Sequence, residues 1–293
     1  MPSIMDDYID IFRKELIHQE KSEHTIRAYT RDVQEFIEWF TVTLGDYSPK
    51  QVTAVDIQEY RGYLYNIKNN KPATVNRKLA GIEQYFNVLA GAGIIENNPA
   101  IAVKPIRYQK QTGADALDSK DLYRLKRMFY MEDNKRDIAI FELMVNTGLR
   151  EAEVCDLQLN DVSISDRKGT VVVRSGKGEK YREVPLNADA RRAITAYLEV
   201  RPDRGNYLFV SNKSDRLSES QLYRIIRKYA DMAGIKAYPH MLRHTFATKL
   251  LRDGGVDLVT VKELLGHASI NTTAVYTKAN RQDMEKAVET LEI

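Results

Sequence analysis

The helical pattern of the chain breaks between about residues 97 and 113, and this break constrains the fold more than any other feature. Pro99 and Pro105 remove helical continuity there. The same stretch carries the basic side chains Lys104, Arg107 and Lys110. At 293 residues the chain exceeds the usual size of one domain. We therefore expect two domains joined by a solvated basic linker, with the divisions at 1–104, 105–115 and 116–293.

The first hundred residues predict a helical domain. Apolar side chains recur every three to four positions in three runs, the first of them after Ser22, a candidate N-cap. The second run contains Ile57, Tyr60, Leu64 and Ile67, and the third follows Pro72. We expect each apolar stripe to pack into a core and the polar faces to meet a partner. The polar residues that open the third helix are Thr74, Asn76, Arg77 and Lys78.

The second half of the chain mixes helices with three short strands. Asp118 or Ser119 is placed to cap a helix, and further helices are expected from about Lys135 to Gly148 and from about Arg150. The strand-like stretches are 162–164, 170–174 and 181–185, separated by the turns D-R-K-G and S-G-K-G-E-K. Helical patterns resume from Asp189. The expected fold is therefore mainly α, with a small antiparallel β-sheet in a mixed α/β second domain.

Composition excludes some classes of protein and leaves others open. The net charge of +3 permits nucleic-acid binding without demonstrating it. A single cysteine, Cys155, excludes an intramolecular disulfide and a cysteine zinc cluster. The acidic N-terminus does not resemble a secretory signal, and the apolar stretch 138–145 is too short to cross a membrane. We expect a cytoplasmic protein with no membrane partner.

Seven residues of the second domain are the candidates for chemistry. They are Arg150 and Glu153 in T-G-L-R-E-A-E, Lys177 in a glycine-rich turn, His240 and Arg243 in H-M-L-R-H, His267 in L-L-G-H, and Tyr276. Each alone has an ordinary explanation. Arg150 and Glu153 suit a surface ion pair, Lys177 a solvated turn, and Tyr276 is one of 17 tyrosines.

The combination of these side chains predicts phosphoryl transfer without a metal ion. Arginines stabilise charge on the non-bridging oxygens of a phosphodiester, and a tyrosine hydroxyl attacks in line once its proton is accepted. A mobile lysine can protonate the leaving oxygen. His240 and His244 have the spacing of zinc ligands, but Met241 stands where H-E-x-x-H requires glutamate. We therefore expect no metal and no cofactor.

Motifs in the order T-G-L-R-x-x-E, G-K-G, H-x-L-R-H-T-F-A-T, L-L-G-H and Y-T resemble the signature of the tyrosine recombinase (phage integrase) family. The resemblance covers the whole second domain. In the first domain, S-E-H-T-I-R-A-Y and T-V-N-R-K-L-A look like the family's helical, SAM-like core-binding domain. The size of the chain is similar to stand-alone Xer-type or transposon-resolvase-type members.

The resemblance implies a task for each candidate residue. Arg150 and Arg243 would bind the scissile phosphate, with His240 and His267 as further phosphate contacts. Lys177 would protonate the departing 5′ oxygen. Tyr276 would form a 3′-phosphotyrosyl bond, and Glu153 would support the site. DNA would be bound by Thr74, Asn76, Arg77 and Lys78.

The family also implies the partners. The expected assembly is a homo-tetramer on two double-stranded DNA sites with inverted-repeat cores, exchanging strands through a Holliday junction. The tail from about Gln282 to Leu291 would dock on a neighbouring protomer or on its own domain, and we favour exchange. The biological task (chromosome dimer resolution, transposon resolution, or integration and excision) stays open, as does any accessory protein. The alternatives are a type IB topoisomerase, a catalytically degenerate DNA-binding protein and, less favoured, a zinc hydrolase.

Overall fold

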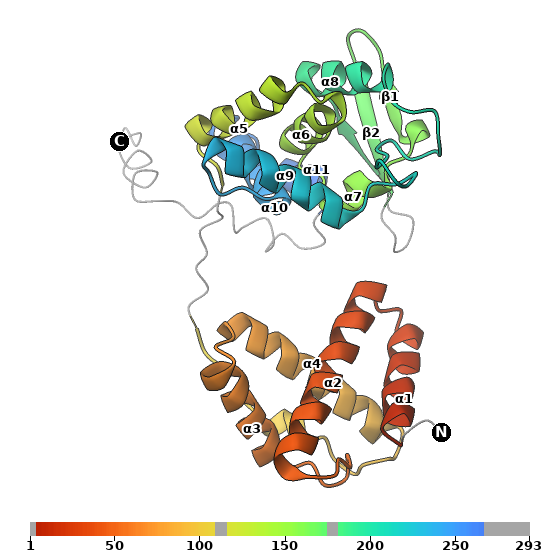
Figure 1. The fold of residues 1–293 in the computed structure, drawn as a ribbon, viewed down its shortest axis with the longest axis vertical. Helices are drawn as coiled ribbons and strands as arrows, with labels where there is room; N and C mark the ends of the chain where they lie inside the picture. The colour runs from red at the N-terminus through yellow and green to blue at the C-terminus, as the bar shows by residue number, and fades with distance from the viewer. Residues whose placement is uncertain (1–3, 109–115, 175–180, 267–293) are drawn as a thin grey trace, which may run out of the picture. The chain divides into compact units, whose positions relative to one another are not determined.

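The computed structural model describes residues 4–108, 116–174 and 181–266. The chain divides into two compact units, residues 1–110 and 111–293 (Figure 1). Helices dominate both units, and the described strands form one three-stranded antiparallel sheet in the second unit. The predicted fold class is confirmed.

Within residues 4–108, the first unit has four α-helices and two shorter helical turns. Its elements are α1 (Ile4–His18), α2 (Glu23–Leu44), α3 (Ala54–Gly62), the π-helix η1 (Tyr63–Ile67), α4 (Pro72–Gly91) and the 3-10 helix η2 (Pro99–Ala102). Ser22 caps α2 by accepting a hydrogen bond from the Thr25 backbone N–H at 3.2 Å, as the sequence predicts. Aromatic and aliphatic side chains from these helices form one core. Within it, the Phe36 ring packs edge-to-face against the rings of Tyr60 and Phe86.

The π-helical turn η1 changes the direction of the second apolar stripe. Ile57, Tyr60 and Leu64 are buried as expected, but Ile67 is 69% exposed, so the expectation that it packs into the core is wrong. The Lys68 backbone N–H donates to the Tyr63 carbonyl, five residues earlier, instead of four. This wider turn shifts the residues that follow it around the helix axis, which removes Ile67 from the buried face.

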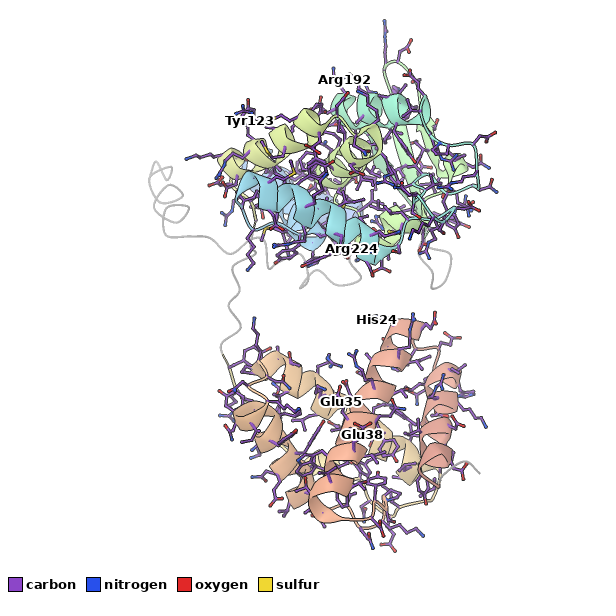
Figure 2. All side chains as sticks on the ribbon, viewed as in Figure 1. His24, Glu35, Glu38, Tyr123, Arg192 and Arg224 are labelled. Atoms are coloured by element: carbon purple, nitrogen blue, oxygen red, sulfur yellow. The ribbon has the colours of Figure 1, made fainter. Side chains whose placement is uncertain are left out.

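A network of ion pairs joins α2 to α4. Asp32 is fully buried and accepts from Arg77 Nη2 at 2.9 Å, while Lys78 contacts both Asp32 and Glu35. Glu35 lies on α2 (Figure 2). The side chain of Lys78 is only 9% exposed. Lys78, one of the four polar residues predicted to bind DNA, is therefore buried in this unit, because a buried carboxylate needs a paired charge.

The segment that follows η2 is held to the first unit. The Asn76 side chain donates to the Ile106 carbonyl at 2.9 Å and accepts from the Ile106 N–H at 2.8 Å. Arg61 donates to the Lys104 carbonyl at 2.6 Å. These contacts attach the start of the connecting segment to α3 and α4.

The second unit combines helices with the sheet. The helices among its described residues are α5 (Ser119–Glu132), α6 (Lys135–Thr147), α7 (Glu151–Asp156), η3 (Leu159–Asp161), α8 (Ala188–Leu198), α9 (Glu219–Ala233), α10 (Pro239–Arg252) and α11 (Leu258–Leu265). The strands are β1 (Val162–Ile164), β2 (Gly169–Arg174) and β3 (Tyr181–Pro185), in the order β1-β2-β3. These strands agree with the predicted stretches to within one residue.

The helix α6 lies at the centre of the second unit (Figure 1). Most of its residues are buried, and it packs against α8 and α10. Asp118 accepts from the Asp121 N–H at 2.7 Å and thereby caps α5, as predicted. In the sheet, Val171 of β2 pairs with Val184 of β3, and Arg174 pairs with Tyr181. No helix among the described residues is long and apolar enough to cross a membrane.

Candidate active site

Three arginines meet the C-terminal end of α11. The carbonyl of Leu264 accepts from Arg182 Nε at 2.9 Å, that of Leu265 from Arg243 Nη2 at 2.7 Å, and that of Gly266 from Arg150 Nη2 at 3.2 Å. The last carbonyls of a helix have no partner within the helix and carry partial negative charge. Arginines from β3, α10 and the start of α7 satisfy them. We call Arg150, Arg182 and Arg243 the arginine cluster.

Arg150 is placed by the sharp end of α6. Gly148 ends that helix at φ +63°, a conformation that favours glycine. A Cβ at this position would lie 2.5 Å from Phe246 and 2.9 Å from Leu265, so glycine also allows close packing. Leu149 is fully buried, and Arg150 then stands at the N-cap of α7 with 45% of its side chain exposed.

Glu153 anchors two members of the cluster. Its carboxylate accepts from the Arg150 N–H at 2.8 Å and from Arg150 Nη1 at 2.7 Å, and it also accepts both terminal nitrogens of Arg182. Burial would raise the pKa of Glu153, but hydrogen bonds and charge from Arg182, followed by those from Arg150, lower this pKa to about 2. The carboxylate is therefore ionised at neutral pH. With a side chain only 12% exposed, it is not a surface ion pair.

Arg243 and His240 lie one turn apart on α10, as the sequence predicts. The side chain of Arg243 is only 2% exposed and donates to the carbonyls of Gly148, at 2.6 Å, and Leu265. Burial, followed by the positive charges of Arg243 and Arg150, lowers the pKa of His240 below its ordinary value of 6.5. The His240 ring meets the His244 ring edge-to-face at 4.3 Å between centroids. Burial and the two arginine charges therefore both favour the neutral form of the His240 ring.

The structure brings four of the seven predicted residues together: Arg150, Glu153, His240 and Arg243. Lys177, His267 and Tyr276 lie outside the described residues. Among the residues with described positions, no group of three or more histidine, cysteine, aspartate or glutamate side chains is arranged to hold a metal ion. A neutral imidazole beside two permanent cations suits the binding of a phosphate and the acceptance of a proton.

Sequence reasoning missed Arg182. A signal for it exists in the alternation of strand 181–185, because Arg182 shares a face with Val184, which is only 1% exposed. An arginine at an inward-facing strand position requires a buried partner. In this unit the partners are Glu153 and the end of α11, both distant in sequence.

Comparison with known proteins defines the class. Residues 116–283 match the family described as "Phage integrase family", and residues 8–96 match "Phage integrase, N-terminal SAM-like domain". The chain belongs to the phage integrase family. It is a site-specific tyrosine recombinase, an enzyme that cleaves and rejoins DNA through a tyrosine intermediate, and as a family these enzymes act without a metal ion.

Relatives extend this likeness over most of the chain. Tyrosine recombinase XerC of Thermodesulfovibrio yellowstonii is 37% identical over 273 residues, covering 87% of this chain and 86% of that protein. Tyrosine recombinase XerA of Thermococcus kodakarensis is 33% identical, covering 97% and 95%. The solved structure of the XerH site-specific recombinase bound to palindromic difH substrate is 26% identical, covering 90% and 79%, with a TM-score of 0.75. The resemblance inferred from the motifs is confirmed.

Proposed function

We propose that the arginine pair Arg150 and Arg243 binds the scissile phosphate and that Tyr276 is the nucleophile. The observation that carries this proposal is the convergence of the two guanidinium groups on the last residues of α11, with His240 close enough for both charges to depress its pKa. Fixed positive charge beside a neutral base is what a metal-free phosphoryl transfer needs. The arrangement supports binding of a phosphodiester, whose charge grows in the transition state.

The proposed reaction proceeds in two balanced steps. The Tyr276 oxygen bonds to phosphorus while the bond from phosphorus to the 5′ oxygen breaks. The tyrosine proton passes to His240, and Lys177 supplies a proton to the departing 5′ oxygen. His267 adds a hydrogen bond to the phosphate. A 5′ hydroxyl then attacks the phosphotyrosyl ester in the reverse sense, so rejoining needs no ATP and no cofactor.

In this proposal the two units have different functions. Residues 1–104 form the core-binding domain, residues 105–115 the linker and residues 116–293 the catalytic domain. Of the four residues proposed for DNA contact at the start of α4, Thr74 and Arg77 are partly exposed. Asn76 is engaged with Ile106, and Lys78 is buried. We therefore assign the DNA contact at this helix end to Thr74 and Arg77.

We also propose the assembly. The XerH structure contains a palindromic substrate, and a palindrome presents two equivalent half-sites to two protomers. By analogy, this chain would bind two inverted-repeat sites as a tetramer, exchange strands through a Holliday junction and use its C-terminal tail between protomers. An enzyme acting on DNA would work in the cytoplasm, as the composition predicts.

Covalent capture tests the residue assignments. The purified protein is incubated in EDTA with nicked fragments of its native replicon, and denaturing gels reveal any protein–DNA adduct. We expect an adduct with the native protein and none with Tyr276→Phe, and sequencing of the captured DNA then identifies the target. An adduct formed equally by Tyr276→Phe would overturn the assignment of the nucleophile. Loss of the native adduct in EDTA would overturn the metal-free mechanism.

A further inference from the structure

Arg182 forms three hydrogen bonds within the protein and is not one of the residues that we assign to the scissile phosphate. Its side chain is 14% exposed and lies on the inward face of β3. Nη1 donates to Glu153 Oε1 at 2.9 Å, Nη2 to Glu153 Oε2 at 2.7 Å and Nε to the Leu264 carbonyl at 2.9 Å. All three nitrogens of the guanidinium are thus engaged within the protein. Two parallel bonds to one carboxylate fix direction as well as distance.

The carboxylate that Arg182 holds is also the anchor of Arg150. Each Glu153 oxygen accepts one bond from Arg182 and one from Arg150, the latter at 2.7 Å from Nη1 and 2.8 Å from the backbone N–H. The Arg150 side chain is 45% exposed, so few packing contacts restrain it. Its direction therefore depends on where Glu153 lies, and Arg182 determines that.

A second connection runs through the end of α11. Arg182 binds the Leu264 carbonyl and Arg150 binds the Gly266 carbonyl, so both arginines align with the same helix end. Gly266 adopts φ +63°, and a Cβ there would lie 2.7 Å from Arg182 Nη1 and 3.0 Å from its Cζ. The backbone at Gly266 therefore lies so close to the Arg182 guanidinium that a larger residue would clash with it. Arg182 therefore packs against Gly266, the glycine of the L-L-G-H motif.

We propose that Arg182 is a positioning residue for DNA cleavage, which orients Arg150 through their shared carboxylate and aligns it with the end of α11. The proposal rests on the assignment of Arg150 as a ligand of the scissile phosphate. Misplacement of a reacting group by about 1 Å slows a reaction roughly 10²-fold. Arg182→Gln should therefore slow covalent cleavage by about that factor without removing any group that touches DNA.

The experiment compares single-turnover adduct formation by the full chain on the captured site. The variants are Arg182→Gln, Arg182→Lys, Arg150→Ala and the double variant Arg150→Ala/Arg182→Gln. The matched control is Arg174→Gln, on the neighbouring strand β2, whose ion pair with Asp161 does not involve Glu153. We expect the control to cleave at the native rate. We expect the double variant to be no slower than Arg150→Ala, because Arg182 would act through Arg150.

A neutral phosphate analogue separates positioning from general stability. With a methylphosphonate at the scissile link, the non-bridging oxygens carry less charge and the reaction depends less on Arg150. We expect the defects of Arg150→Ala and Arg182→Gln to shrink together on this substrate. A defect of Arg182→Gln that stays unchanged while that of Arg150→Ala shrinks would overturn the proposal, as would a full further loss in the double variant.

If the Arg182→Gln variant does not fold, Arg182→Lys tests the proposal in its place. Lysine keeps the charge beside Glu153 but cannot hold both carboxylate oxygens and the Leu264 carbonyl together. We expect this variant to fold and still cleave slowly, and cleavage at the native rate would overturn the proposal. If Arg150→Ala itself cleaves at the native rate, the assignment of Arg150 fails instead, and the two failures are thereby distinguished.

Discussion

The guanidinium of Arg243 donates to the carbonyl of Leu265, the last residue of α11, at 2.7 Å. The same side chain donates to the Gly148 carbonyl at the end of α6, and it is only 2% exposed. Arg243 therefore joins two helix ends in the interior of the second unit. A residue proposed to bind phosphate is in this way also part of the structure that holds Arg150 in place.

Arg243→Ala should lose both stability and activity. It leaves two buried carbonyls without this partner, so we expect the free energy of unfolding to fall by about 3 kcal/mol. Urea unfolding measures this loss, and adduct formation should fall by at least roughly 10²-fold. The control is Arg224→Ala, an exposed position on α9 (Figure 2), which should change stability by less than about 0.5 kcal/mol. Equal stability of the two variants would contradict the role assigned to Arg243.

Gly148→Ala should destabilise the second unit and displace Arg150. The left-handed backbone and the 2.5 Å approach to Phe246 both oppose a Cβ, so we expect a loss of roughly 2 kcal/mol in unfolding free energy. Gly91→Ala is the matched control. Gly91 is the last residue of α4, and a Cβ added there would meet no other atom within 4 Å. Thermal unfolding of both variants tests this. A Gly148→Ala protein as stable as the control would be inconsistent with the close packing described.

Glu153→Gln should remove a pH-dependent part of the stability. The pKa of Glu153 is lowered from 4.5 to about 2 in the folded protein, so its stabilising effect is complete above pH 4.5 and is lost as the pH falls towards 2. The shift corresponds to roughly 3 kcal/mol. We expect the difference in unfolding free energy between native protein and variant to shrink from about pH 5 downwards. A difference that does not vary with pH would count against a low pKa.

His240 should titrate below its ordinary pKa of 6.5, because burial and the charges of Arg243 and Arg150 disfavour the imidazolium. Cleavage that depends on the neutral ring should therefore persist below pH 6.5 and fall as the pH drops through the lowered pKa. NMR titration of the imidazole signals measures this pKa, and His240→Gln assigns the signal. Arg150→Ala should raise the pKa. An unchanged pKa in that variant would show that the charge of Arg150 does not reach the ring.

Lys78→Gln should weaken folding of the first unit without altering its contacts with DNA phosphates. Lys78 lies between Asp32 and Glu35, so its loss leaves the buried Asp32 with Arg77 as its ion-pair partner. The slope of log affinity against log salt counts phosphate contacts, at about 0.9 for each. We expect this slope to stay at the native value in Lys78→Gln and to become shallower in Arg77→Gln. A shallower slope for Lys78→Gln would show instead that Lys78 contacts a DNA phosphate.

Local patterns predicted most of the elements of the fold. Ser22 and Asp118 cap the helices they were expected to cap, and the three strands fall within one residue of the predicted stretches. These signals depend on neighbours a few residues away in the chain. The π-helical turn at Tyr63–Ile67 was not predicted, because reading apolar residues at a 3.6-residue period assumes an unbroken α-helix.

The sequence by itself determined the set of chemical groups: two arginines, a lysine, two histidines and a tyrosine in motifs whose order identifies the family. Only the tertiary structure decided how the described groups are held. Arg182 reaches Glu153 and Leu264, and Lys78 reaches Asp32, across separations of many residues. A charged side chain in a sequence has no fixed surroundings. Folding decides whether it stays in water or pairs with a buried carboxylate, because desolvation and pairing depend on segments that meet only in three dimensions.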